Sequence, residues 1–173
     1  MKRLYLLRHA KSSREEPGLA DYERPLAPRG AKAARTLAKV MAARRLLPAL
    51  ALCSAAARTR ATWELMAPTL GDVPTQYESG LYLASAADLL HRLRQVPAVT
   101  TSVLMIGHNP GLHELALMLV AAEATRAGIG LSRLRVKFPT ASLAVFTVPF
   151  ASWNGLVAGG CPLDLFLRPA YLA

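Results

Sequence analysis

A short apolar run near the N-terminus that ends abruptly in two polar residues constrains this chain most. The run, Leu4 to Leu7, reads LYLL and leads directly into Arg8 and His9. Its length is that of a buried strand and too short for a helix. In an open α/β sheet, ligands bind beyond the carboxyl ends of the strands. Arginine binds phosphate through a planar fork of donors, and histidine acts as a nucleophile or acid–base group near neutral pH. The stretch therefore predicts a phosphate-handling site.

Two later segments repeat this plan of a strand followed by a cationic or imidazole side chain. Residues 49–53 predict a second buried strand, and the SAAAR turn after it places Arg58 at the start of a helix over 59–70. Residues 102–106 predict another buried strand, with His108 at its end. Carboxyl ends of parallel strands joined by right-handed crossovers lie along one edge of a sheet. We therefore expect these side chains to meet those of the first strand.

The predicted pocket contains Arg8, His9, Arg58 and His108, with no fixed carboxylate among them. Such a set suits a phosphoryl group, because the charge on its oxygens in the transition state needs preorganised donors.

His108 is followed by a predicted helix over 112–122, with Asn109 as its N-cap and Pro110 at its first position. A helix N-terminus favours anions through its free amide groups and dipole. Asn109, together with Ser12 and Arg24 from the stretch after the first strand, is a further candidate for substrate contacts.

Residues 10–28 have no apolar periodicity and contain three prolines and a glycine, which predicts a loop. A loop this long is usually functional or disordered, and we interpret it as covering the site. Asp21 and Arg24 within it either lie near the ligand or form an ordinary surface ion pair.

The other predicted elements complete a single α/β domain over residues 1–173. They are a helix over about 29–45, a short strand over 75–77, a helix over 85–95, an irregular stretch over 124–139, and strands over 142–148 and 163–167 that pair as a hairpin.

Composition narrows the class of protein further. A hydrophobic fraction of 53% argues against disorder, and no stretch is long and apolar enough to span a bilayer. The first apolar run stops at Arg8, so it makes a poor signal peptide. Cys53 and Cys161 are too few for a disulfide framework, which favours a reduced, cytoplasmic protein. The net charge of +10 reflects scattered arginines without interleaved aromatics, so we expect neither nucleic-acid nor membrane binding.

Three other kinds of site fit the sequence poorly. A cysteine phosphatase needs an arginine six residues after its nucleophile, but Thr59 stands there after Cys53, and the intervening loop has no glycine. The histidines show neither a close pair on a helix face nor an accompanying CxxC, so a zinc site is disfavoured. Without a glycine-rich phosphate loop, ATP or dinucleotide binding has no support.

The chain resembles the histidine phosphatase superfamily, which includes the phosphoglycerate mutases, and within it the short SixA-type phosphohistidine phosphatase branch. The resemblance spans essentially the whole chain. It rests on LYLLRHAKS at the N-terminus, RPLAPRG at 24–30, SAAAR at 54–58 and MIGHNPGL at 105–112. A lone Arg-His pair is weak evidence, but all these motifs in this order and spacing are specific.

The resemblance implies a three-layer fold with a mixed, mainly parallel sheet between helices. It implies that His9 is a nucleophile that forms a phosphohistidine intermediate, which water hydrolyses. Arg8, Arg58 and His108 match the rest of the phosphate pocket, and no metal or organic cofactor is expected. Ala10 and Ala55 depart from the glycine and proline that many members carry, but neither change removes a reactive group.

The general acid and the substrate are linked questions. Glu78 lies where mutase-like members carry their acid, so it is the candidate for protonating the leaving oxygen, with a surface glutamate as the alternative. A phosphohistidine leaves as an imidazole, which depends less on such an acid than an alkoxide does. The hypotheses are therefore a phosphatase of protein phosphohistidine, a phosphatase of small phosphate esters, or a phosphate-binding module of the same fold without turnover. The oligomeric state stays open.

Overall fold

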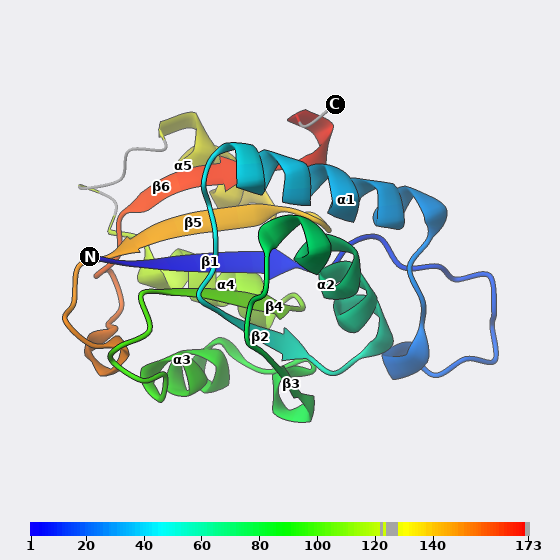
Figure 1. Ribbon diagram of the computed structural model, residues 1–173, viewed down its shortest axis with the longest axis horizontal. Helices are drawn as coiled ribbons and strands as arrows, with labels where there is room; N and C mark the ends of the chain where they lie inside the picture. The colour runs from blue at the N-terminus through cyan, green and yellow to red at the C-terminus, as the bar shows by residue number, and fades with distance from the viewer. Residues whose placement is uncertain (122, 124–127, 172–173) are drawn as a thin grey trace.

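The computed structural model describes residues 1–121, 123 and 128–171, and a single six-stranded sheet forms its centre (Figure 1). The strands are β1 (Lys2–Arg8), β2 (Leu50–Ser54), β3 (Thr75–Glu78), β4 (Ser102–Gly107), β5 (Leu143–Val148) and β6 (Leu163–Leu167). Their order across the sheet is β3-β2-β4-β1-β5-β6. Neighbours from β3 to β1 pair in parallel, whereas β5 is antiparallel to both β1 and β6. The mixed, mainly parallel sheet and the β5–β6 hairpin are thus confirmed.

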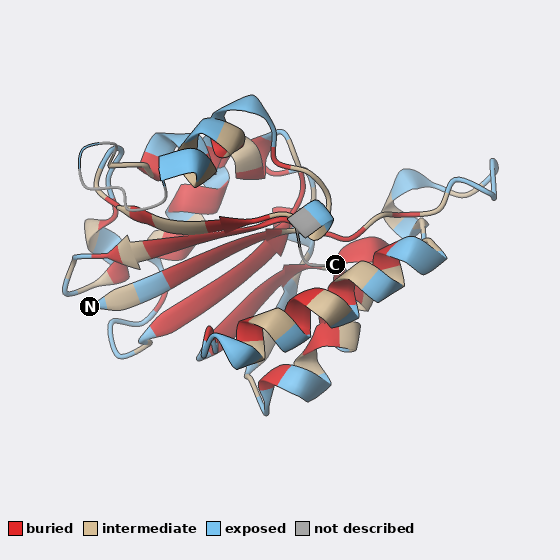
Figure 2. Cartoon of the chain, turned by 90° about the horizontal axis from the view of Figure 1, so that it is seen from above, coloured by how far each residue is buried: buried red, intermediate tan, exposed pale blue. Residues whose placement is uncertain are grey.

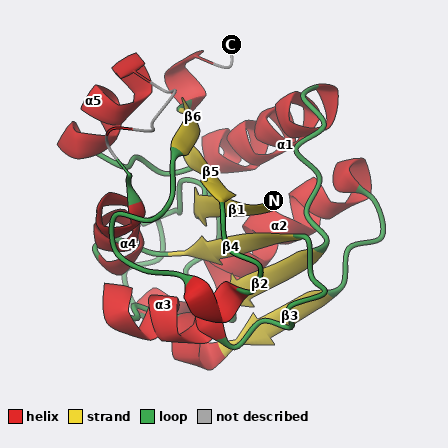
Figure 3. Cartoon of the chain, turned by 90° about the vertical axis from the view of Figure 1, so that its left-hand side faces the viewer, coloured by secondary structure: helices red, strands yellow, loops and turns green. Residues whose placement is uncertain are grey.

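Helices cover both faces of this sheet. One face carries α1 (Pro28–Ala43) and α2 (Ala57–Leu70), and the other carries α3 (Ala86–Arg94), α4 (Gly111–Leu119) and α5 (Gly128–Val136) (Figure 3). The three-layer architecture implied by the sequence is therefore confirmed.

The alternation of side chains along β1 explains why its sequence is apolar throughout. Leu4 and Leu6 pack in the core on the side of α3 to α5, whereas Tyr5 and Leu7 pack on the side of α1 and α2. All four side chains are buried, as are most residues of the strands beside them (Figure 2). A strand with helices on both faces needs apolar residues at every position, which is why parallel sheets read as continuous hydrophobic runs.

Two predictions about helices are wrong. Pro110, not Asn109, is the N-cap of α4, and the Asn109 side chain instead donates from Nδ2 to the carbonyl oxygen of Phe138 at 3.0 Å. The helix also ends at Leu119, and Ala122 lies outside the described residues.

The stretch predicted as irregular contains α5, while residues 124–127 lie outside the described part of the chain. Among the described residues of α5 only Leu134 is buried, and Ile129 and Val136 are exposed. A helix that buries so little shows no apolar stripe in its sequence, because contacts with the rest of the fold hold it in place.

The carboxyl ends of β2, β4 and β1 lie together at one edge of the sheet. The register pairs Arg8 with Gly107, so the next residues, His9 and His108, lie side by side. The loop after β1 extends from this edge and comes back to it through a bridge between Ser12 and Leu26 (Figure 1). Among the described residues, no helix has the length and apolar character needed to cross a membrane.

Candidate active site

A pocket of about 160 Å³ opens at this edge of the sheet. Its lining brings together all the predicted site residues except Glu78: Arg8, His9, Ser12, Arg24, Arg58, His108 and Asn109. Lys11, Arg14, Leu83 and Thr140 complete the lining and were not predicted. Lys11 and Arg14 directly follow the first predicted strand end, so their positive charge and position were signals that could have found them.

His9 is buried, with one ring nitrogen fixed by the backbone. Its Nδ1 lies 2.8 Å from the carbonyl oxygen of Ala10, which can only accept, so Nδ1 carries the hydrogen. Nε2 therefore has the lone pair, and it accepts a hydrogen bond from Nε of Arg58 at 3.3 Å. Burial, followed by the charges of nearby arginines, lowers the pKa of His9 to about 4, against the opposing effect of the Ala10 hydrogen bond. At neutral pH His9 is an uncharged imidazole with its lone pair in the pocket.

The peptide that holds His9 is itself tied to α2. The amide of Ala10 donates to Oγ1 of Thr62 at 3.0 Å, and the Thr62 hydroxyl donates to the carbonyl oxygen of Arg58 at 2.6 Å. One buried threonine thus links the backbone that orients His9 to the helix that carries Arg58.

Arg58 is held by Asp21, a residue that is not itself among those that line the pocket. Its Nη1 donates to the backbone oxygen of Asp21 at 2.6 Å and its Nη2 to Oδ2 of the same residue at 3.0 Å. Asp21 also accepts from Arg24 at 3.0 Å and from the Tyr82 hydroxyl at 2.5 Å. The Tyr82 hydrogen bond and the two arginines hold the pKa of Asp21 well below its usual range. The loop after β1 therefore clamps Arg58 through the Asp21 carboxylate.

Arg8 and Asn109 converge on the carbonyl oxygen of Phe138. Nη1 of Arg8 and Nδ2 of Asn109 each donate to it at 3.0 Å. Nε of Arg8 is buried and has no hydrogen-bond partner within the described residues. A buried donor without a partner is costly, so this guanidinium is prepared for an acceptor that enters the pocket.

His108 lies next to His9, with 5.2 Å between the ring centroids. Its Nε2 is 2.8 Å from Oγ of Ser54, and its buried Nδ1 has no hydrogen-bond partner in the described part of the chain. Burial, followed by the charges of His9 and Arg58, lowers the pKa of His108 to about 3. His108 is therefore also uncharged at neutral pH.

Ser12 and Arg24 both line the pocket and contact each other directly. Nη2 of Arg24 donates to Oγ of Ser12 at 2.7 Å, and Nε of Arg24 donates to the carbonyl oxygen of Ser13 at 3.0 Å. The ion pair of Arg24 with Asp21 then connects this contact to Arg58. Asp21 and Arg24 thus form the ion pair that was one of the two alternatives, and Arg24 also lines the pocket.

Glu78 does not line the pocket. It ends β3, at the outer edge of the sheet, and both its carboxylate oxygens accept from Arg92 on α3 at 2.7–3.0 Å. Arg92 binds both carboxylate oxygens and holds them outside the pocket lining, so the geometry gives no support to the prediction of Glu78 as the general acid. The sequence identified the segment that contains Glu78, but the position of its partner Arg92 depends on how α3 packs.

The electrostatics of the pocket favour a phosphoryl group. Arginines and a lysine surround two neutral imidazoles, and no aspartate or glutamate is among the described lining residues. Fixed cationic donors stabilise the charge that spreads over phosphoryl oxygens in the transition state. The described residues also contain no group of three or more His, Cys, Asp or Glu side chains that could hold a metal ion.

The protonation state of His9 can be tested by NMR. Because its pKa is lowered to about 4, its ring resonances are expected to remain those of a neutral imidazole from pH 8 to pH 5. The His9→Ala spectrum identifies the signal by its loss. A midpoint near 6.5, the ordinary value for histidine, would contradict the proposed environment.

The lowered pKa of His9 also predicts how acid changes the free energy of unfolding. In the unfolded chain His9 takes up its proton near pH 6.5, whereas in the fold it does so near pH 4. Unfolding therefore takes up a proton between these values, and the free energy of unfolding falls as the pH falls through this window. At pH 5 the loss is about 2 kcal/mol for such a histidine. Urea unfolding at pH 7 and pH 5, compared between the native chain and His9→Ala, measures it.

Comparisons with known proteins agree with this geometry. Residues 4–82 match the model of the histidine phosphatase superfamily (branch 1). An uncharacterized protein of Mycobacterium tuberculosis (strain H37Rv) is 38% identical over 165 residues, which cover 94% of this chain and 99% of that protein. A structure from Agrobacterium tumefaciens, provisionally named phosphohistidine phosphatase SixA, is 29% identical with a TM-score of 0.82, covering 97% of this chain and 98% of that one. A similarly named structure from Nakamurella multipartitia is 29% identical with a TM-score of 0.80, covering 97% and 96%.

Proposed function

Because the chain belongs to the histidine phosphatase superfamily, in its SixA-type branch, and is a phosphoryl-group hydrolase, we propose that it dephosphorylates protein phosphohistidine through a phospho-His9 intermediate, without a metal. The observation that carries the mechanism is the state of His9. Its Nδ1 hydrogen is held by Ala10, so the lone pair is on Nε2, where it accepts a 3.3 Å hydrogen bond from Arg58 at the pocket. A nucleophile needs this arrangement before substrate arrives.

In the first step, Nε2 of His9 forms a bond to phosphorus while the bond from phosphorus to the substrate nitrogen breaks. If the second ring nitrogen of the substrate histidine is protonated, that ring departs as a neutral imidazole. In the second step, a water oxygen bonds to phosphorus, the bond to His9 breaks, and both protons of the water leave with the phosphate. The guanidinium groups of Arg8 and Arg58 stabilise the phosphoryl oxygens in both steps.

The choice of phosphohistidine is supported by the lack of an aspartate or glutamate among the described lining residues. Asp21 is close to the pocket, but its lowered pKa keeps it ionised, and Glu78 is paired with Arg92 outside the lining. An alkoxide leaving group needs a general acid, whereas a protonated imidazole does not. The pocket therefore suits cleavage of a phosphorus–nitrogen bond better than cleavage of an ester.

The test compares turnover of a phosphohistidine-bearing protein with turnover of an aryl phosphate, in the presence of a chelator. We expect rapid hydrolysis of phosphohistidine and little hydrolysis of the ester, with no loss on chelation. Glu78→Gln is the internal control, because a residue outside the pocket should leave the ratio of the two activities unchanged. Faster ester turnover that Glu78→Gln selectively slows would instead support a small-molecule phosphatase. Binding of phosphate or vanadate without turnover of either substrate would support a binding module.

A further inference from the structure

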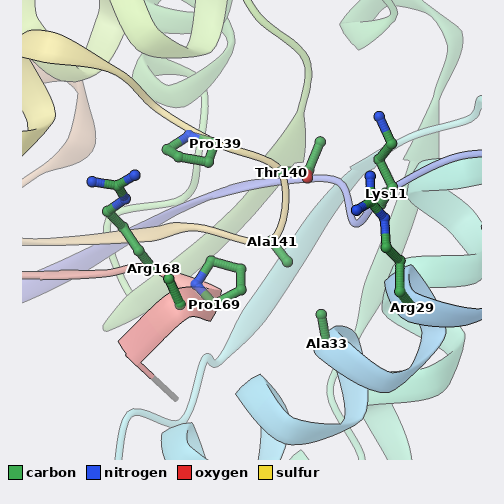
Figure 4. Close-up of a pocket in the computed structure, with 9 residues that line it drawn as sticks. Lys11, Arg29, Ala33, Pro139, Thr140, Ala141, Arg168 and Pro169 are labelled. Carbon is green, nitrogen blue, oxygen red and sulfur yellow. The ribbon is translucent and has the colours of Figure 1, made fainter. Parts of the chain in front are cut away.

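A second cavity adjoins the phosphate pocket and is also basic. Its volume is about 450 Å³, against about 160 Å³ for the phosphate pocket. We call it the basic groove and define it by Lys11, Arg29, Ala33, Thr140, Arg168 and Pro169, which are among its lining residues. In Figure 4, Lys11 and Arg29 lie on one side of the cavity and Arg168 and Pro169 on the other. The three cationic residues come from the loop after β1, the first turn of α1 and the segment after β6.

The two cavities lie next to each other, because Lys11 and Thr140 line both of them. The phosphate pocket has room for a phosphoryl group but not for the rest of a substrate. The larger cavity next to it is therefore the nearest space for the atoms that carry the phosphoryl group.

Two of the cations that line the basic groove, Lys11 and Arg29, have no carboxylate partner within the described residues. The described lining of the basic groove also contains no aspartate or glutamate. Elsewhere in the structure, by contrast, Arg24, Arg58 and Arg92 each pair with a carboxylate. Cations that converge on a cavity without a counter-charge raise the local concentration of anions and favour an anionic ligand.

We propose that the basic groove binds a second anionic group of the substrate, a carboxylate from an acidic residue close to the phosphohistidine. This inference rests on the proposed function, which makes the substrate a protein. The groove then selects acidic segments, because Arg29 and Lys11 receive the carboxylate while the phosphoryl group lies against Arg8 and His9. A small phosphate ester with a second anion offers the same chemistry from a different source.

Two synthetic phosphohistidine peptides test the proposal. They are identical except that glutamates beside the phosphohistidine in one are glutamines in the other, and the measured quantity is the ratio of their kcat/KM values. We expect the acidic peptide to be preferred by the native chain. Arg29→Gln should lower this ratio about fivefold, the upper range for a solvent-accessible ion pair. Arg29→Glu should lower it further by repulsion. Arg29 is exposed, so neither change threatens the fold.

Arg35→Gln is the matched control, because Arg35 is exposed on the same helix, carries the same charge and does not line the basic groove. The ratio should stay at its native value in this variant. A native ratio near one, with both peptides turned over, would overturn the inference and leave the proposed function intact. An equal fall in Arg29→Gln and Arg35→Gln would also overturn it, since only the overall charge would then matter.

A second substrate pair separates this inference from the proposed function. If neither peptide is hydrolysed, the proposed function fails, and carboxyphenyl phosphate is compared with carbamoylphenyl phosphate. A preference for the carboxylate that Arg29→Gln removes and Arg35→Gln preserves would support the basic groove with a small molecule as its ligand. Equal turnover of the two esters in that case would overturn it.

Discussion

The His9→Ala variant is expected to lose turnover of phosphohistidine by at least about 10⁴-fold, because removal of a nucleophile leaves only the binding groups of the site. The neighbouring His108 has its Nε2 engaged with Ser54. Quenched-flow trapping with ³²P-labelled substrate measures the second consequence. The native chain should carry alkali-stable, acid-labile phosphate, and the variant should carry none.

His91→Ala is the control for this change. His91 is exposed on α3 and contacts Gln95, so the same substitution there should leave turnover unchanged. Circular dichroism establishes that both variants are folded. Full labelling of His9→Ala, or turnover within a factor of ten of the native chain, would mean that another group is the nucleophile.

Gly30→Ala is expected to lower the free energy of unfolding by about 3 kcal/mol, the upper range for overpacking. Gly30 lies in the first turn of α1, which packs directly on the backbone of the loop after β1. A Cβ atom at this position would lie 2.1 Å from the carbonyl oxygen and 2.8 Å from the amide nitrogen of Lys11. Backbone atoms have no alternative rotamer, so the helix and the loop must move apart. The displacement should also reduce activity, because Lys11 lines the phosphate pocket.

Urea unfolding of Gly30→Ala and Gly80→Ala measures this effect against a matched change. A Cβ atom added at Gly80 meets nothing within 4 Å, and we expect a difference of less than about 0.5 kcal/mol there. A loss at Gly30 of about 3 kcal/mol corresponds to a fall in Tm of roughly 6–12 °C for a chain of this size. Equal stabilities of the two variants would show that the close approach of α1 to the loop is not maintained in solution.

The main elements of the fold could be predicted because their signals are local. Residues 4–7 and 103–106 are apolar at every position, a pattern typical of a strand covered on both faces, and both lie in central strands. The helix α5 could not be predicted in this way, because it buries only Leu134 among its described side chains. An element held by a few distant contacts leaves little trace in its own sequence.

The residues of the site likewise divide into those that the local sequence predicts and those whose contacts depend on packing. Arg8, His9, Arg58 and His108 were predictable, because each follows a strand whose carboxyl end must lie at a common edge of a parallel sheet. The packing of the loop after β1 decided that Asp21 clamps Arg58, a contact between residues 37 positions apart. The packing of α3 against β3 likewise decided that Glu78 pairs with Arg92.

The sequence by itself therefore determined the strands, the main helices and the chemistry at the strand ends, because hydrophobic periodicity and the order of the motifs act over short stretches of chain. Only the tertiary structure decided which carboxylate meets which arginine, which tautomer His9 adopts and that Lys11, Arg29 and Arg168 line one cavity. The reason is physical. Ion pairs, buried hydrogen bonds and cavities depend on side chains that approach from separate elements, and no spacing along the chain encodes that distance.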